Sequence, residues 1–502
     1  MPIDLAQPGG LTFAALPELV LAGWAMVLML VTAWRHQTAG DVRFAGYVAL
    51  LGLVSALGVE AWFWTSGVHA NGLAHMIALD PFRYATACVF LIGGILTVLL
   101  SLGYLEREGI GVPEYYLLVL LAVLGMMFMS AGTDLIVVFL GLELMSIAVY
   151  VLAGINRRSV FAAEAALKYF LLGAFASAFF LYGIALIYGA TGSTNIQRVY
   201  LEIATLGLEH STLLLLGTGL LLIGFGFKVA AVPFHMWAPD VYDGSPTPVT
   251  AFMAAAVKAA GFAALVRLLI MGLGPLEVTW SALLAVLAGI TMVVGNLIAL
   301  SQRQLKRMLA YSSVGHAGYV LVALVSGTEL GVAAYLFYIL VYTLMTVGAF
   351  AVLAAVGRDG ERDVLVDDMS GLSRERPWLA AAMTVFMLSL LGFPGTGGFI
   401  GKWYILSAAV DGNNLGLAVI LVGASVVSAG YYLPVIMAMY MKPLIAEGAH
   451  DHAGVRGPVR MVVAVTAILL LVLGVWPNRV MDAAASGANQ MRPTVIIAEL
   501  TD

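Results

Sequence analysis

The stretch Phe225-Gly-Phe-Lys228-Val-Ala-Ala-Val-Pro233-Phe-His235-Met-Trp-Ala-Pro239-Asp240 places a lysine, two prolines and a histidine inside a long apolar run. A second long run contains Pro394-Gly-Thr-Gly-Gly-Phe-Ile-Gly-Lys402, which again combines a break with a lysine. Proline removes a backbone donor, and irregular backbone is tolerated at membrane depth only inside protein or beside a wet cavity. The two stretches therefore predict two broken membrane helices, interrupted at Pro233 and at Pro394, each beside a lysine.

The composition places the chain in a lipid bilayer. Hydrophobic residues make up 62% of the 502 and charged residues 11%, whereas a soluble domain has about 25% charged residues. No basic tract is present, so nucleic acid is not an expected partner. The single Cys88 excludes an internal disulfide, a CxxC metal site and an iron–sulfur cluster. We expect this chain to bind no metal and no cofactor.

Apolar runs of about 20 residues are needed to cross the membrane core, and the sequence contains about fourteen. They lie at residues 15–35, 43–64, 82–104, 114–131, 133–155, 161–190, 211–238, 247–272, 278–300, 304–326, 329–356, 377–409, 414–441 and 458–477. The N-terminus has no basic n-region, so we expect the first run to be retained as a span. The sequence predicts an all-α polytopic membrane protein.

The distribution of basic residues predicts the orientation. One set of alternate loops holds fifteen: Arg35, Arg43, Arg107, Arg157, Arg158, Arg303, Lys306, Arg307, Arg358, Arg362, Arg374, Arg376, Lys442, Arg456 and Arg460. The other side holds five: Arg83, Arg198, Arg267, Arg479 and Arg492. Basic residues accumulate on the cytoplasmic side. We therefore expect the first set to be cytoplasmic and both termini to face the opposite side.

The two broken spans occupy corresponding places in the chain. Span 7 is fourth in the set 4–8, and span 12 is fourth in the set 9–13. Sets of five helices enter the membrane from opposite sides, which is typical of inverted repeats in transporters. We predict spans 1–3 in residues 1–110, a first repeat in 111–272, an inverted second repeat in 273–445, and span 14 with the tail in 446–502.

Four ionisable residues are predicted to lie in one central layer: Glu143, Lys228, Lys258 and Lys402. Helical rise puts Glu143 about 15 Å deep in span 5 and Lys258 at a similar depth in span 8. Burial favours the neutral form of a lysine, while a nearby carboxylate favours the charged form, so such a set can bind and release protons. Glu143 is the natural partner of Lys228. The alternative is a static ion pair that fixes helix packing.

Four further residues are secondary candidates for a proton path. Lys168 either conducts or forms an ordinary i,i+4 pair with Glu164. His316 either relays protons or is a structural buried histidine, and the same alternatives hold for His235 in the first break. Lys306 is a snorkelling anchor or a proton exit. Two further features have a structural interpretation: Asp240 and Asp243 as turn and cap residues, and the charged loop from Arg358 to Arg376 as a solvated face.

With these residues the chain resembles a known family, the antiporter-like membrane subunits of respiratory complex I, and most closely the subunit N family of bacterial NADH-quinone oxidoreductase. The resemblance covers nearly the full length. It rests on the two break motifs and on Leu140-Gly-Leu-Glu143-Leu-Met-Ser146, Gly244-Ser-Pro246-Thr247-Pro248-Val-Thr-Ala-Phe and Lys306-Arg-Met-Leu-Ala-Tyr311-Ser-Ser-Val-Gly-His316-Ala-Gly-Tyr319. Subunit M-like chains carry a glutamate where Lys402 stands, and subunit L-like chains run on into a lateral helix that this chain lacks.

The resemblance implies a proton-translocating subunit of the membrane arm, in which Glu143 pairs with Lys228, Lys258 continues the central axis and Lys402 communicates with the opposite side. NADH, FMN, iron–sulfur clusters and quinone are expected in other subunits. The implied partners are subunits M, K and J in a bacterial inner membrane. Two alternatives remain: a subunit of a multi-subunit cation/proton antiporter, and a non-conducting scaffold of the membrane arm.

Overall fold

The structure is a computed structural model that describes residues 2–4, 8–34, 39–71, 76–357, 364–443, 457–489 and 491. Five of the arginines in the loop count lie outside the described residues: Arg35, Arg358, Arg362, Arg456 and Arg492. The first six residues of the charged 358–376 loop and most of the C-terminal tail also lie outside them.

The N-terminal part contains three long helices and a small cap. The long helices are α2 (Leu16–Trp34), α3 (Ala39–Thr65) and α4 (Pro81–Ser101), and α4 is followed by the short α5 (Tyr104–Arg107). The cap consists of α1 (Pro8–Ala14) and two three-residue strands, β1 (Pro2–Asp4) and β2 (His69–Asn71), which pair in parallel. Asp80 starts α4 by accepting a hydrogen bond from the Arg83 backbone N–H, with Pro81 at the first helical position.

The middle of the chain contains the first broken span. The elements are α6 (Glu114–Ala131), α7 (Leu135–Ala153), α8 (Val160–Thr191), α9 (Ile196–Leu206), η1 (Leu208–His210), α10 (Thr212–Val229) and α11 (Ala238–Gly244). One continuous membrane segment follows, built from α12 (Thr247–Phe252), the π-helical turn η2 (Met253–Val257), α13 (Lys258–Arg267) and the π-helical turn η3 (Leu268–Gly272).

The C-terminal part contains the second broken span. Its elements are η4 (Gly274–Leu276), α14 (Glu277–Leu300), α15 (Leu305–Val325), α16 (Glu329–Val356), η5 (Asp367–Met369), α17 (Leu372–Glu375), α18 (Pro377–Leu391), α19 (Gly397–Asp411), α20 (Leu415–Met441), α21 (Gly457–Val475) and α22 (Asn478–Asn489).

The predicted spans are confirmed. Within the described residues, 13 helices are long and apolar enough to cross a membrane, and the shorter apolar α18 continues after a break into α19. Together these account for all the predicted runs. The apolar runs do not predict α1, α9, α22 or the β1–β2 pair, because these elements do not span the membrane and lie outside the runs. The division into two inverted repeats remains a prediction.

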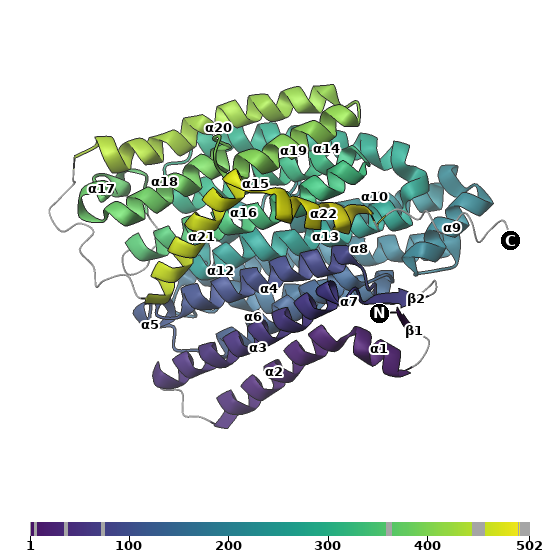
Figure 1. Ribbon diagram of the computed structural model, residues 1–502, viewed down its shortest axis with the longest axis horizontal. Helices are drawn as coiled ribbons and strands as arrows, with labels where there is room; N and C mark the ends of the chain where they lie inside the picture. Colours follow the sequence, from purple (N-terminus) through teal and green to yellow (C-terminus); the bar gives the residue numbers. More distant parts are fainter. Residues whose placement is uncertain are drawn as a thin grey trace.

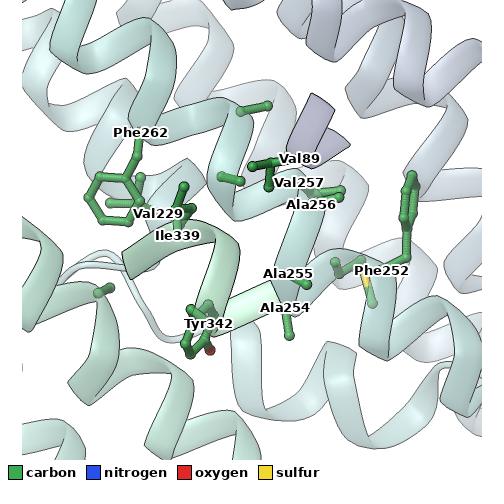
Figure 2. Close-up of a cluster of buried hydrophobic side chains, with 14 of the residues drawn as sticks. Val89, Val229, Phe252, Ala254, Ala255, Ala256, Val257, Phe262, Ile339 and Tyr342 are labelled. Carbon is green, nitrogen blue, oxygen red and sulfur yellow. The ribbon is translucent and has the colours of Figure 1, made fainter. Parts of the chain in front are cut away.

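The helices lie side by side, with α2 and α3 at one edge of the molecule and α20 at the opposite edge (Figure 1). The segment α12–η2–α13 runs through the centre, where the most apolar window of residues 247–272 is entirely buried. Figure 2 shows apolar side chains from this segment, among them Val257 and Phe262, beside Val89, Val229 and Ile339 of other helices. This packing puts the start of α13 in the interior.

Loops that carry basic residues meet on one face of the molecule. Arg43 at the start of α3 bonds Glu106 of α5, and the Arg107 guanidinium donates to the Ala354 carbonyl at the end of α16 at 2.6 Å. Lys442 after α20 pairs with Asp367 of η5 at 2.5 Å. The first two contacts join the ends of α3, α4 and α16, and the third joins the end of α20 to η5, the next element after α16. We call this the basic face.

Candidate functional site

The first break exposes the end of α10, and tertiary contacts satisfy it. The chain turns at Ala230, which has a left-handed φ of 58°. The Trp237 indole N–H donates to the Phe227 carbonyl at 3.0 Å, and the Val232 N–H donates to the Thr291 hydroxyl at 3.0 Å. Trp237 also stacks on Tyr169 with ring centroids 4.4 Å apart. Backbone groups that a helix interior would have paired are thus paired by side chains, as membrane depth requires.

Lys228, at the end of α10, lies in a buried polar pocket. Its side chain is 2% exposed, and its ammonium donates to the Ser146 hydroxyl at 2.7 Å and to the Tyr150 hydroxyl at 3.2 Å. The ammonium also lies over the Tyr150 ring, 5.3 Å from the centroid. Lys228 packs against α13, because a Cβ on Gly261 would lie 3.4 Å from the Lys228 Cβ. The amine is therefore held between α7 and the central segment.

Glu143 lies on α7 one helical turn from Ser146 and is half-buried. Its carboxylate accepts a hydrogen bond from Ser177 of α8 at 2.5 Å. Glu143 and Lys228 are close enough to attract each other electrostatically, but they make no ion pair within 4 Å. Each is bound to a different serine, Glu143 to Ser177 and Lys228 to Ser146, so the expected partners lie near each other without a direct contact.

Lys258 is the first residue of α13 and follows the π-helical turn η2 directly. A π-helical turn inserts an extra residue into a helix and is frequent at functional sites. The Lys258 side chain is 2% exposed, and its ammonium donates to the Ser313 carbonyl at 2.7 Å and to the Ser313 hydroxyl. No sequence signal used above indicated the π-helical turn.

His316 lies on α15 between Lys258 and Lys402, and both lysines are close enough to act on it electrostatically. Its two ring nitrogens contact two tyrosine hydroxyls: Nδ1 is 2.6 Å from Tyr338 and Nε2 is 3.1 Å from Tyr432. The Tyr432 hydroxyl also bonds Ser312, the neighbour of the serine that holds Lys258. A chain of exchangeable protons therefore runs from Ser312 through Tyr432 to His316, and Ser312 is adjacent in sequence to Ser313, which binds Lys258.

Lys402 fastens the second break. The chain leaves α18 through Gly392, whose left-handed φ of 87° suits a residue without Cβ. The Lys402 ammonium donates to the last carbonyls of α18, Leu390 at 2.9 Å and Leu391 at 3.0 Å. It lies over the Tyr319 ring, 4.6 Å from the centroid. Two of its three donors are thus occupied by a helix end, whereas the end of α10 is fastened by Trp237.

A cavity of about 390 Å³ opens beside the second break. Its lining residues come from the break, from α19 and from α20, and are apolar apart from Lys402 and Ser425. Pro394 and Phe393 stand at its edge, and both are exposed. Pro394 thus lies between the two half-helices α18 and α19, at the edge of a cavity that the Lys402 side chain also lines.

Lys168 belongs to a charged cluster on the basic face. Its ammonium pairs with Glu164 at 2.7 Å and with Asp240 of α11 at 2.8 Å, and Arg307 pairs with Asp240 at 3.0 Å. These groups, together with Asp243, line a polar cavity of about 130 Å³. Burial by itself would raise the pKa of the Asp240 carboxyl, but hydrogen bonds from Lys168 and Arg307 bring it below its usual value. The i,i+4 pair is confirmed, and Asp240 is an ion-pair partner as well as a turn residue.

Two of the secondary candidates, Lys306 and His235, lie apart from the chain that contains His316, and Lys306 is more deeply buried than a snorkelling anchor would be. Lys306 is 4% exposed, and its ammonium donates to the Ser245 carbonyl after α11 at 2.9 Å, so it does not snorkel to water. Its chemistry is that of a buried amine between the basic face and the central segment. His235 lies in the first break and is half-buried, apart from the His316 chain.

The sequence indicates the ionisable groups but not their hydroxyl partners, Ser146, Ser313, Tyr338 and Tyr432. Ser146 and Ser313 stand in motifs that carry the resemblance, but nothing in the local sequence shows that any of the four contacts a lysine or a histidine. Serine and tyrosine are tolerated throughout membrane helices, so only packing reveals which of them face a lysine or a histidine.

The arrangement defines a class: a polytopic membrane protein with two broken helices and a buried row of basic residues. Residues 132–428 match the family described as NADH:quinone oxidoreductase/Mrp antiporter, TM. A relative from Trichlorobacter lovleyi, NADH-quinone oxidoreductase subunit N, is 47% identical over 93% of this chain and 95% of the relative. The chain belongs to the NADH-quinone oxidoreductase subunit N family.

Solved structures agree with this assignment. A chain of respiratory complex I from Thermus thermophilus is 39% identical, with a TM-score of 0.79, and the match covers 94% of this chain and 100% of that one. A chain of the Mrp complex from Dietzia sp. is 21% identical, with a TM-score of 0.82 over 97% of this chain and 99% of that one. The second likeness concerns the fold alone.

Proposed function

We propose that this chain is a proton-translocating membrane-arm subunit of a proton-pumping NADH:quinone oxidoreductase, and that the redox reactions take place in other subunits. The observation that carries the proposal is the row of three almost fully buried lysines at the two breaks and at the central π-helical turn: Lys228, Lys258 and Lys402, which are 2%, 2% and 6% exposed. A buried amine in a membrane protein is costly and marks ion or proton paths.

The first step concerns Lys228. Its ammonium is held by the hydroxyls of Ser146 and Tyr150, and Glu143 lies on the same helix, α7, one turn from Ser146. Movement of Glu143 toward or away from Ser146 changes the electrostatic support of the ammonium, because a nearby carboxylate favours the charged form. Glu143 therefore biases whether Lys228 keeps its proton or passes it on.

The second step concerns Lys258 and His316. Lys258 is bound to Ser313, and Ser312 is bound to Tyr432, which contacts His316. Hydroxyls both donate and accept, and a neutral imidazole carries one donor and one acceptor, so Ser312, Tyr432 and His316 can pass a proton among themselves. The proposed transfer from Lys258 enters this chain at the adjacent serines Ser313 and Ser312. His316 is thus proposed as the relay between the central lysine and the second break.

The third step concerns Lys402. An ammonium has three donors, and two of those of Lys402 hold the end of α18. The amine can lose its third proton while both of these hydrogen bonds remain. Lys402 can therefore change charge without releasing the helix end. The cavity that Lys402 lines is also lined by the residues of the break.

Lys168 and Lys306 are proposed as the connection to the basic face, which we take to be cytoplasmic by the loop charge count. Both termini are then periplasmic in a bacterial inner membrane. The proposed partners are the neighbouring antiporter-like subunit M and the small subunits K and J. NADH, FMN, iron–sulfur clusters and quinone are assigned to other subunits of the complex.

The test uses the whole complex in sealed liposomes. Lys228→Met and Lys258→Met should each assemble, keep NADH:quinone reductase chemistry and lower the number of protons moved per electron pair. Lys442→Met is the matched control, because that lysine is half-exposed and pairs with Asp367 at the surface. An unchanged proton ratio in both buried variants, with the complex intact, would reject the proposal in favour of the scaffold.

The second candidate is a cation/proton antiporter subunit, because the description of the family that matches residues 132–428 includes the Mrp antiporter. A tag on this chain separates the two. NADH:quinone reductase activity that copurifies from native membranes supports the proposal. A multi-subunit complex without this activity, whose proton movement depends on sodium, supports the antiporter.

A further inference from the structure

A second cluster of charged residues is buried where α2, α3 and α4 meet the end of α13, the helix that begins with Lys258. It contains Glu18, Glu60, Arg83 and Arg267, each at most 1% exposed, together with Asp80 at the start of α4. The cluster lies at the ends of these helices opposite the basic face, since Glu18 and Arg83 are the third residues of α2 and α4.

Two guanidinium groups in the cluster each have a carboxylate of their own. Arg83 donates to both oxygens of Glu18, at 2.8 and 2.7 Å, and its remaining contacts are to the Ala78 and Ala14 carbonyls. Arg267 forms a two-bond pair with Asp80, at 2.7 and 3.0 Å. The Arg267–Asp80 pair is bidentate, the strong form of the interaction, whereas Arg83 reaches both Glu18 oxygens from the single nitrogen Nη2. One carboxyl group of the cluster has no arginine partner of this kind.

Glu60 is that group. Neither of its oxygens has a hydrogen-bond partner among the described residues, and its side chain is fully buried. Its nearest cation is the Arg83 Nε at 3.9 Å, which also lacks a hydrogen-bond partner there. An ionised carboxylate without hydrogen bonds is very costly to bury, and such a group takes up a proton instead. Three carboxyls facing two guanidiniums also leave one negative charge uncompensated.

We propose that Glu60 is a proton-binding site, separate from the lysine row, that carries its proton while Arg83 is bound to Glu18. The proton leaves when the Arg83 Nε closes the gap to Glu60 and supplies the missing hydrogen bond. The other groups that act on Glu60 are Glu18 and Asp80, and Glu60 in turn acts on Tyr84 and Cys88. The described residues contain no group of three or more His, Cys, Asp and Glu that could hold a metal ion, which leaves the proton as the ligand.

The position suits exchange with one side of the membrane. Glu60 lies five residues before the end of α3, which is about 8 Å along a helix. The cap formed by α1, β1 and β2 covers this end, and Arg83 touches it through the Ala14 carbonyl. A shift of the cap would therefore move Arg83, the residue that decides whether Glu60 keeps its proton.

The test compares wild type, Glu60→Gln and Glu18→Gln in the intact complex by infrared spectroscopy at neutral pH. The wild type should show a protonated-carboxyl C=O band that is lost in Glu60→Gln and shifts when the buffer is changed to D₂O. The band should also weaken in Glu18→Gln, because loss of the Glu18 carboxylate frees Arg83 to approach Glu60. Glu60→Gln should assemble in full yield, because glutamine is a neutral mimic of the protonated acid, whereas Glu18→Gln should lower the yield.

Three results would overturn the proposal. The first is a protonated-carboxyl region that is identical in wild type and Glu60→Gln. The second is failure of Glu60→Gln to assemble, which would mean that a charged carboxylate is needed there. The third is a band that does not respond to D₂O, which would mean that the proton is not exchangeable. None of these results depends on the lysine row, so the two proposals fail separately.

Discussion

Replacing Lys402 by methionine should loosen the second break before it changes anything else. The Lys402 ammonium donates to the carbonyls of Leu390 and Leu391 at 2.9 and 3.0 Å. A hydrogen bond from a charged group contributes about 1.5–3 kcal/mol, so loss of both weakens the break by roughly 3–6 kcal/mol. Each 1.4 kcal/mol is a factor of ten in an equilibrium. The break should therefore open about 10² to 10⁴ times more often.

The assay is amide hydrogen exchange followed by mass spectrometry on the assembled complex, read at peptides that cover residues 392–398. Three amides there report on the break, because Gly392 and Phe393 bond the Leu388 carbonyl and Gly398 bonds the Ser389 hydroxyl. Lys402→Met should exchange faster at these amides by the factor above.

Lys258→Met is the matched control for this experiment. It removes an equally buried ammonium but makes no contact with the break, so exchange there should match wild type. Wild-type exchange rates at residues 392–398 in an assembled Lys402→Met complex would refute the idea that this lysine fastens the end of α18. Faster exchange in both variants would point instead to a general loosening caused by lost charge.

Three further predictions follow from individual contacts. Tyr432→Phe should lower the protons moved per electron pair in liposomes, since it removes the hydroxyl between Ser312 and His316. Tyr115→Phe removes an equally buried hydroxyl that bonds Ser101 at 2.8 Å and should not lower the ratio; equal effects would contradict the relay. Asp240→Asn should speed amide exchange in α11 at neutral pH, and the wild type should reach the same exchange rate only in acid. The reason is that a carboxyl whose pKa is held below 3.8 stabilises the fold above that pH and loses this effect as the pH falls through its own pKa. A wild type whose α11 exchanges faster already near pH 6 would be inconsistent with this. Gly398→Ala should lower the stability of the fold by about 1–3 kcal/mol or more and reduce assembly, because its Cβ would lie 1.9 Å from the Ser389 carbonyl oxygen. Gly416→Ala is the control, since a Cβ there meets open space and the variant should assemble normally. Normal assembly of Gly398→Ala would contradict the close approach.

The sequence by itself determined the membrane spans and both breaks. Apolar runs of membrane length are a local property, and Pro233, like Pro394 with its glycine neighbours, interrupts a helix whatever surrounds it. The ionisable residues were equally visible, because Lys228, Lys258 and Lys402 stand out in apolar sequence. The resemblance carried by the break motifs named the family to which the comparisons assign the chain.

Only the tertiary structure decided what each charged group touches. Lys228 meets Ser146 and Tyr150 from 82 and 78 residues away, and Lys258 meets Ser313 from 55 residues away. Glu18 and Glu60 read as ordinary residues near the ends of spans, yet they share one arginine in the interior. Helical periodicity gives depth along one span but not its rotation against a neighbour. That rotation is set by side-chain packing over the whole bundle, and it determines which hydroxyl, carbonyl or ring each lysine meets.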